Sequence, residues 1–138
     1  MRTAIDSNVI SALWSREPMA SQIVMLLGGA QSEGGLTICA PVYAELLAYP
    51  KASPDFVNEF MVKTNVTIDF LLAEEVWLLA TQSFAEYARK RRKSKGTNPK
   101  RFLVDFIIGA HAMVRADRLL TLDRSRYERS FPTLKLLP

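Results

Sequence analysis

Five short apolar segments alternate with stretches of helical periodicity, and this alternation most constrains how the chain of 138 residues can fold. Each segment is rich in aliphatic or β-branched side chains and is bounded by polar or turn-forming residues, as strands are. The expected strands cover residues 3–5, 36–39, 66–70, 119–122 and 134–137. Because helices fill the spaces between them, we expect one α/β domain over residues 1–138, with a mostly parallel central sheet flanked by helices.

Local signals also predict where several helices begin and end. Ser7 is the expected N-cap of the first helix. Pro18 is expected to open the second helix, and the pair Gly28-Gly29 to end it. The longest helix is expected over residues 74–93, where apolar side chains recur at helical spacing.

Asp105 is a carboxylate in an otherwise apolar helical run, residues 102–114. Burying an ionised carboxylate without a partner costs several kcal/mol or more, so a folded chain has to compensate its charge. The compensating group is either a metal ion or a basic side chain, and Arg101 lies one helical turn earlier. Arg101 is equally able to contact a substrate phosphate, and the sequence does not decide between these roles.

Three other carboxylates have comparable settings. Asp6 ends the first expected strand, where it is a candidate for a ligand or for a helix cap. Glu45 falls on the apolar stripe of the helix that Pro41 opens. Asp123 follows the fourth expected strand, with Thr121 on the same side, and its alternative role is to start an Asx-turn.

Four acidic side chains gathered at one place would raise one another's pKa values and destabilise the fold unless a cation joins them. Hard divalent ions such as Mg²⁺ or Mn²⁺ prefer oxygen ligands, and the chain has a single His and a single Cys, which excludes a zinc cluster. The expected acidic centre consists of Asp6, Glu45, Asp105 and Asp123. Such a centre suits phosphodiester hydrolysis, because a metal polarises a phosphoryl oxygen and activates water.

The basic segment, defined as residues 89–101, holds eight of the 18 basic residues and no acid. The rest of the chain therefore has 10 basic and 14 acidic residues. A local excess of positive charge favours a polyanion partner such as RNA or DNA. The alternative is a solubilising helix end. The residues expected to bind nucleic acid are Arg91, Arg92, Lys93, Lys95, Lys100 and Arg101.

The remaining composition predicts a cytoplasmic protein. No apolar stretch reaches the ~18 residues that a membrane span needs, so no membrane partner is expected. The N-terminus lacks the apolar core of a signal peptide. The single cysteine, Cys39, cannot form an internal disulfide and is expected to be a small buried hydrophobe.

Residues 4–9, the helix carrying Glu45, residues 104–112 and residues 119–123 together resemble the PIN-domain family, and more narrowly the VapC-type toxins of toxin–antitoxin pairs. The resemblance spans nearly the whole chain. It implies an endoribonuclease that depends on Mg²⁺ or Mn²⁺, with the four acids as the catalytic centre. By the same pattern, Asp6 and Asp105 come first among the metal ligands.

The resemblance further implies that Asn8 and Thr121 are supporting polar residues. It also implies a homodimer, a cognate antitoxin protein that blocks the site, and a structured RNA such as tRNA or rRNA as substrate. Two alternatives stay open: a catalytically silent PIN module that serves as an RNA- or protein-binding adaptor, and a DNA-cutting nuclease. The chain departs from the family where many relatives have another Asp followed by Phe, because residues 124–127 read Arg-Ser-Arg-Tyr.

Overall fold

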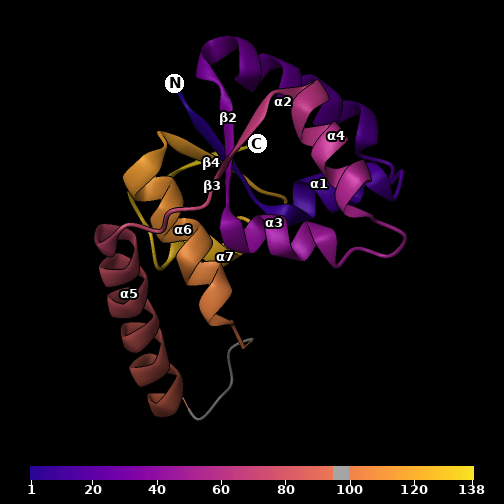
Figure 1. The fold of residues 1–138 in the computed structure, drawn as a ribbon. Helices are drawn as coiled ribbons and strands as arrows, with labels where there is room; N and C mark the ends of the chain where they lie inside the picture. Colours follow the sequence, from indigo (N-terminus) through magenta and orange to yellow (C-terminus); the bar gives the residue numbers. More distant parts are fainter. Residues whose placement is uncertain (95–99) are drawn as a thin grey trace.

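The computed structural model describes residues 1–94 and 100–138, and its strands form one sheet (Figure 1). The strands are β1 (Thr3–Ile5), β2 (Leu36–Cys39), β3 (Val66–Asp69), β4 (Arg118–Leu120) and β5 (Lys135–Leu137). They lie in the order β3-β2-β1-β4-β5, and each neighbouring pair is parallel. The prediction of a mostly parallel five-stranded sheet is confirmed, although β3 and β4 end one and two residues earlier than expected.

Helices cover the sheet from both sides. They are α1 (Ser7–Trp14), α2 (Ala20–Gly34), α3 (Ala40–Leu47), α4 (Pro54–Thr64), α5 (Glu74–Lys93), α6 (Leu103–Arg115) and α7 (Ser125–Glu128). Figure 1 shows α5 and α6 to one side of the strands and α1, α2 and α4 to the other. The α/β prediction is therefore confirmed, and α5 has the bounds that its periodicity predicted.

The order of the strands places a switch point beside β1. From β1 the chain builds β2 and β3 on one side of it and then returns to build β4 and β5 on the other. In open parallel sheets, ligands bind beyond the carboxyl ends of the strands at the point where the strand order reverses. We therefore expect the functional site beyond β1 and β4.

Helix α6 is the most deeply embedded helix. Its residues are buried without interruption from Asp105 to Ala112, and it packs against α3, α5, α7, β1 and β4. A helix that is apolar on all sides needs such surroundings. The close packing is visible at Gly109, where an added Cβ would lie 2.3 Å from the ring of Phe131.

Three expected helix boundaries were wrong. The second helix begins at Ala20 rather than at Pro18, which lies in a turn. The second helix continues through Gly28 and Gly29 and ends at Gly34, because Ile23, Leu27 and Ala30 bury one face along its length. That burial outweighs the helix propensity that each glycine loses, about 1 kcal/mol. Ser7 is the first residue of α1 rather than its N-cap, and its hydroxyl bonds to another helix.

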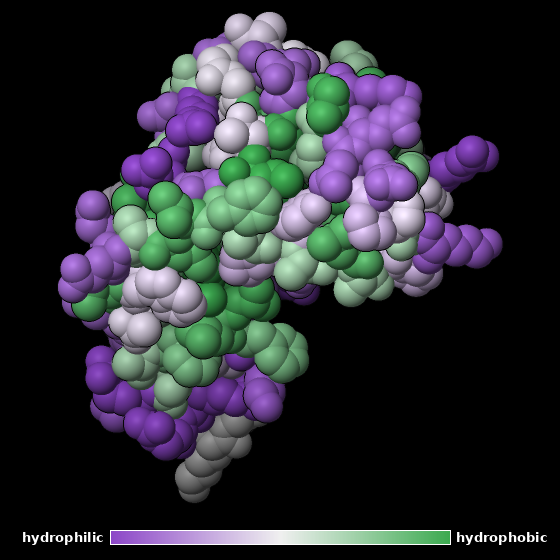
Figure 2. Space-filling view, viewed as in Figure 1, coloured by the Kyte–Doolittle hydropathy of each residue, from purple (hydrophilic) through white to green (hydrophobic). Residues whose placement is uncertain are grey.

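The surface has distinct regions. Figure 2 shows hydrophobic side chains across the middle of the face it displays and hydrophilic ones around the carboxyl end of α5. The exposed apolar residues include Phe70 and Leu71, directly after β3, which are 63% and 81% exposed. Over the residues described, no helix has both the length and the apolar character needed to traverse a bilayer.

Candidate functional site

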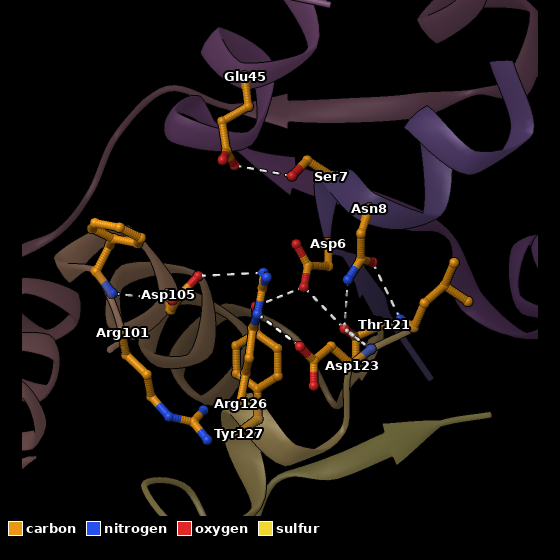
Figure 3. A network of polar contacts seen from close by, with 12 residues as sticks. Asp6, Ser7, Asn8, Glu45, Arg101, Asp105, Thr121, Asp123, Arg126 and Tyr127 are labelled. Atoms are coloured by element: carbon orange, nitrogen blue, oxygen red, sulfur yellow. Dashed lines mark hydrogen bonds and ion pairs between the residues drawn. The ribbon is translucent and has the colours of Figure 1, made fainter. Parts of the chain in front are cut away.

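Asp6 and Asp123 come from neighbouring parallel strands at the expected switch point. Asp6 follows β1 directly, and Asp123 lies three residues after the end of β4. Because β1 and β4 are hydrogen-bonded in parallel register, their carboxyl ends meet at one edge of the sheet. Figure 3 shows the two carboxylates there, with Asp105 and Glu45 facing the same space from α6 and α3.

Asp6 is 1% exposed and is held by hydroxyl groups. Its Oδ2 accepts one hydrogen bond of 2.9 Å from Thr121 Oγ1 and another of 2.7 Å from Tyr127 OH. Its side chain makes no capping bond to α1, so the alternative role of helix cap is not realised. Among the described residues no donor reaches Oδ1. One oxygen therefore fixes the carboxylate, and the other is left to face the centre.

Thr121 and Asn8 connect the two strand ends. Thr121 Oγ1 donates its proton to Asp6 and accepts from the backbone N–H of Asp123 at 3.1 Å and from Asn8 Nδ2 at 3.4 Å. The amide oxygen of Asn8 accepts from the backbone N–H of Leu122 at 3.2 Å. One donor and two acceptor positions are all that a threonine hydroxyl has. The network thus holds the turn that carries Asp123 in a single orientation.

Asp105 lies in the first turn of α6 and is 8% exposed, so the expected burial of this carboxylate is observed. Its Oδ2 accepts from the backbone N–H of Phe102 at 3.3 Å, and its Oδ1 lies 3.7 Å from Arg126 Nη1. The guanidinium of Arg101 instead donates to the backbone carbonyl of Ser125 at 2.6 Å. Of the two roles considered for Arg101, pairing with Asp105 is therefore ruled out by the geometry.

Arg126 joins two of the carboxylates. Its Nε lies 2.9 Å from Asp123 Oδ2, while its Nη1 faces Asp105 (Figure 3). The other oxygen of Asp123 accepts from Ser125 Oγ at 2.7 Å. The Ser125 hydroxyl and the charge of Arg126 lower the pKa of Asp123, although burial opposes them. The nearby charges of Asp105, Asp123 and Asp6 raise the pKa of Arg126 against the effect of its burial.

Glu45 reaches the centre from α3. Val42 and Leu46 on the same helix are buried, but Glu45 is exposed, so its placement on a buried apolar stripe was wrong. The helix turns this side chain toward Ser7, whose hydroxyl donates to Oε1 at 3.0 Å (Figure 3). Partial burial of the carboxyl group, together with the charges of Asp6 and Asp105, raises its pKa, while the Ser7 hydroxyl opposes the rise.

Basic side chains line two cavities beside this centre. A cavity of about 380 Å³ is lined by Phe84, Tyr87, Ala88, Arg91, Arg92, Lys100 and Arg101. A second of about 410 Å³ is lined by Ser83, Glu86, Tyr87, Lys90, Arg91, Arg101, Ser125, Glu128, Arg129 and Ser130. The second cavity adjoins the centre through Ser125, which bonds to Asp123. Of the residues expected to bind nucleic acid, Lys93 ends α5 and Lys95 lies outside the described residues.

The model of the PIN domain matches residues 3–131 of the sequence. The chain belongs to the PIN domain family. A search of curated proteins by sequence finds no match. The family resemblance inferred from the sequence is therefore confirmed by the family model.

Two solved structures show the same fold as this PIN domain. One is the crystal structure of VapBC2 from Rickettsia felis bound to a DNA fragment from their promoter, with 16% identity and a TM-score of 0.64 over 99% of this chain and 98% of that one. The other is VapBC-1 from nontypeable Haemophilus influenzae, with 19% identity and a TM-score of 0.65 over 99% and 97%. At such identities the likeness establishes the fold.

PIN nucleases generally use divalent metal ions, and the donor chemistry of this PIN domain fits one. All four acids present carboxylate oxygens, which hard divalent cations prefer. In their described positions, however, no three His, Cys, Asp or Glu side chains lie close enough together to hold a metal ion. The guanidinium of Arg126 lies between two of the acids instead. The four acids thus supply the type of ligand atom that a divalent ion prefers. The guanidinium of Arg126 has to be taken into account at the same site.

Sequence reasoning missed three residues of the centre. Ser7 was taken for a helix cap, and Arg126 and Tyr127 belong to a polar stretch that was noted only as a departure from the family. The one signal for Tyr127 was its aromatic ring among charged neighbours, which is typical of a buried position; the residue is 0% exposed. Burial and the charge of Asp6 raise the pKa of its hydroxyl, so it acts as a donor to that carboxylate.

Proposed function

We propose that this PIN-domain protein is an endoribonuclease dependent on Mg²⁺ or Mn²⁺ and is the toxin of a VapBC-type toxin–antitoxin pair. Its proposed substrate is a structured RNA such as tRNA or rRNA. The observation that carries the proposal is the convergence of Asp6, Glu45, Asp105 and Asp123 at the carboxyl edge of the sheet, at its switch point. Carboxylates from four separate parts of the chain face the same space there, and packing alone does not require that.

The proposed roles follow from the positions of the four acids. Asp6, Asp105 and Asp123 would hold the ion, which when bound supplies charge stabilisation for the phosphate and activation of water. Thr121 and Tyr127 fix Asp6 Oδ2, so that Oδ1 keeps one direction toward the centre. Glu45, whose pKa is raised, is better suited to take a proton than an ordinary exposed glutamate.

The basic lining of the second cavity favours a long anionic substrate. Its lining includes four basic side chains, Lys90, Arg91, Arg101 and Arg129, against two acidic ones, and it lies beside the turn that carries Asp123. Contacts of this kind attract the phosphate backbone without reading sequence. We propose that RNA passes through this cavity with its cleaved bond at the acidic centre.

The proposed partners are a cognate antitoxin and a second copy of the chain. Support for the antitoxin comes from the two structural neighbours, which are both VapBC assemblies. The exposed apolar side chains, among them Phe70 and Leu71, supply the type of surface that protein partners cover.

A cleavage assay tests the proposed activity. Purified protein is incubated with total tRNA and rRNA in Mg²⁺ or Mn²⁺, with EDTA as the metal-free control. Asp6→Asn removes the charge that faces the centre and is expected to lower cleavage at least about a thousandfold, as losses at catalytic groups do. Asp55→Asn is the matched control, since Asp55 lies in the first turn of α4, away from the centre. Cleavage by Asp6→Asn at the rate of the control, or in EDTA, would contradict the proposal.

One observation favours the catalytically silent adaptor as a second candidate. Arg126 pairs with Asp105 and Asp123, and a carboxylate paired with a guanidinium holds a metal less well than a free one. The same assay separates the candidates, because an adaptor binds RNA in a filter-binding experiment but releases no fragments at any metal concentration.

A further inference from the structure

Arg126 contacts the acidic centre through the oxygens that a cation would use. Its Nε lies 2.9 Å from Asp123 Oδ2 and its Nη1 3.7 Å from Asp105 Oδ1. Within the described part of the chain, every ion pair recorded for the four carboxylates involves this one guanidinium. Figure 3 shows it lying between the two aspartates. A single positive charge therefore occupies the space that the acids surround.

The guanidinium is not locked in this position. The Arg126 side chain is 43% exposed, and the Asp123 side chain is 37% exposed. Ion pairs of this exposure contribute little to stability, because water hydrates both charges almost as well when they separate. The pair with Asp105, at 3.7 Å, is longer than a hydrogen bond. Neither contact therefore holds Arg126 firmly, and it can turn toward solvent when a cation replaces its charge beside the buried Asp105 carboxylate.

The carboxylates, by contrast, keep their positions when Arg126 moves. Asp6 is held by Thr121 and Tyr127, and Asp105 by the backbone N–H of Phe102. Ser125 holds the second oxygen of Asp123. Removing the guanidinium would leave an array of negative charges that attracts a cation strongly, since the same groups would otherwise repel one another.

We propose that Arg126 is a built-in competitor for the divalent cation at this centre. Its guanidinium neutralises Asp105 and Asp123, and it has to leave Asp123 Oδ2 before that oxygen can ligate an ion. The affinity of the protein for metal is thereby lower than the carboxylates alone would give. This inference deepens the proposed function and rests on it only in taking these acids as the metal ligands.

Direct metal binding tests the inference without any RNA. Mn²⁺ is titrated into the full-length protein, and its binding is followed by electron paramagnetic resonance and calorimetry. Arg126→Gln is expected to tighten Mn²⁺ binding about tenfold or more, because a nearby unit charge opposes a divalent one by more than about 1.4 kcal/mol at moderate dielectric. Arg124→Gln is the matched control, because it removes the same charge from the same turn. In the unmodified protein, Arg124 pairs with Glu128 rather than with the acidic centre. Equal or weaker binding by Arg126→Gln than by the control would overturn the inference.

A charge-retaining variant separates charge from shape. Arg126→Lys keeps a cation beside the acids and is expected to bind Mn²⁺ within about threefold of the unmodified protein. Binding as tight as that of Arg126→Gln would also overturn the inference. Circular dichroism of each variant checks that the fold is kept. If no variant cleaves RNA although Arg126→Gln binds Mn²⁺ more tightly, the proposed function fails and the competition stands.

Discussion

Two arginines pair with carboxylates at opposite edges of the same parallel sheet, and they differ in nearly every other respect. At the amino edge, Arg118 begins β4 and donates to Thr3 Oγ1 at 2.8 Å and to Glu33 Oε2 at 2.7 Å. Its side chain is 7% exposed. At the carboxyl edge, Arg126 is 43% exposed and faces Asp105 and Asp123. An arginine–carboxylate pair is therefore buried in the fold at one edge, whereas at the other edge it is exposed and its partners can change.

The difference follows from what surrounds each arginine. Arg118 is enclosed between β1 and α2, so its charge depends on its partners for solvation. Arg126 stands on the four-residue helix α7, where water reaches it. The amino edge thus has a buried arginine bonded to β1 and α2, whereas the edge where ligands bind in such sheets has an exposed one that can change partners. The buried ion pair and the candidate functional site thus lie at opposite ends of the strands.

Replacing Arg118 should produce the largest loss of stability. Arg118→Met removes the guanidinium that joins β1, β4 and α2, and we expect the free energy of unfolding to fall by about 3 kcal/mol. The loss is at the lower end for a buried pair, because Glu33 is 57% exposed and can be hydrated when it is left alone. Urea denaturation measures it. Arg126→Gln, measured alongside, should change the same quantity by less than about 1 kcal/mol. Equal losses for the two variants would contradict the comparison of the two edges.

Gly109 in α6 tests how tightly the protein is packed behind the carboxyl edge of the sheet. A methyl group at this position would overlap the ring of buried Phe131, at 2.3 Å from its Cε2. We expect Gly109→Ala to lower the free energy of unfolding by about 2 kcal/mol, as overpacking of a core does. Thermal and urea unfolding measure it.

Gly28 in α2 is the matched control for Gly109. It is also a helical glycine, but nothing lies within 4 Å of an added Cβ. Gly28→Ala should therefore stabilise the protein by up to about 1 kcal/mol through helix propensity alone. Destabilisation by both alanines would mean that helix conformation rather than the contact with Phe131 sets the result at Gly109.

The fold could be predicted from the sequence because its signals are local and agree with one another. Periodicity predicted the bounds of α5, and short segments rich in aliphatic or β-branched residues located all five strands. The prediction failed where burial outweighed a local signal. Gly28 and Gly29 do not end α2, because apolar residues beyond them, such as Ala30, pack against the core.

The candidate site was predicted only in part, for a physical reason. The four acids stood out because a carboxylate in an apolar setting is conspicuous, and the structure brings them to one edge. Arg126 did not stand out, because a basic residue in a polar turn is ordinary. Its contact with Asp105 joins residues 21 positions apart through the docking of α7 on α6. No periodicity encodes such a contact, so the sequence offered only Arg101 as a possible basic partner for Asp105, whereas the structure places Arg126 there.

His111 and Asp69 form a third pair of ionisable side chains, which can be compared with the pairs at the two edges. It is 1% exposed in α6, and its Nε2 lies 3.1 Å from Asp69 Oδ2 at the end of β3. Burial lowers its pKa below the usual 6.5, and Arg115 and Arg2 act in the same direction, while Asp69 partly offsets the lowering. The folded protein therefore binds a proton at His111 less readily than the unfolded chain does. The pair is buried like Arg118, although it lies toward the carboxyl edge.

The sign of the pH dependence follows from that lowered pKa. Above pH 6.5 the ring is neutral in both states, and its full contribution to stability is present. As the pH falls below 6.5 the unfolded chain takes up the proton first, so the free energy of unfolding should decline, by at most about 1.4 kcal/mol for each pH unit of acidification. Urea denaturation at pH 7.5 and pH 5.5 measures the decline. His111→Gln, which cannot titrate but keeps a donor toward Asp69, should lose this dependence. Because the chain has a single histidine, an equal decline in the variant would contradict the assignment of this pH dependence to His111.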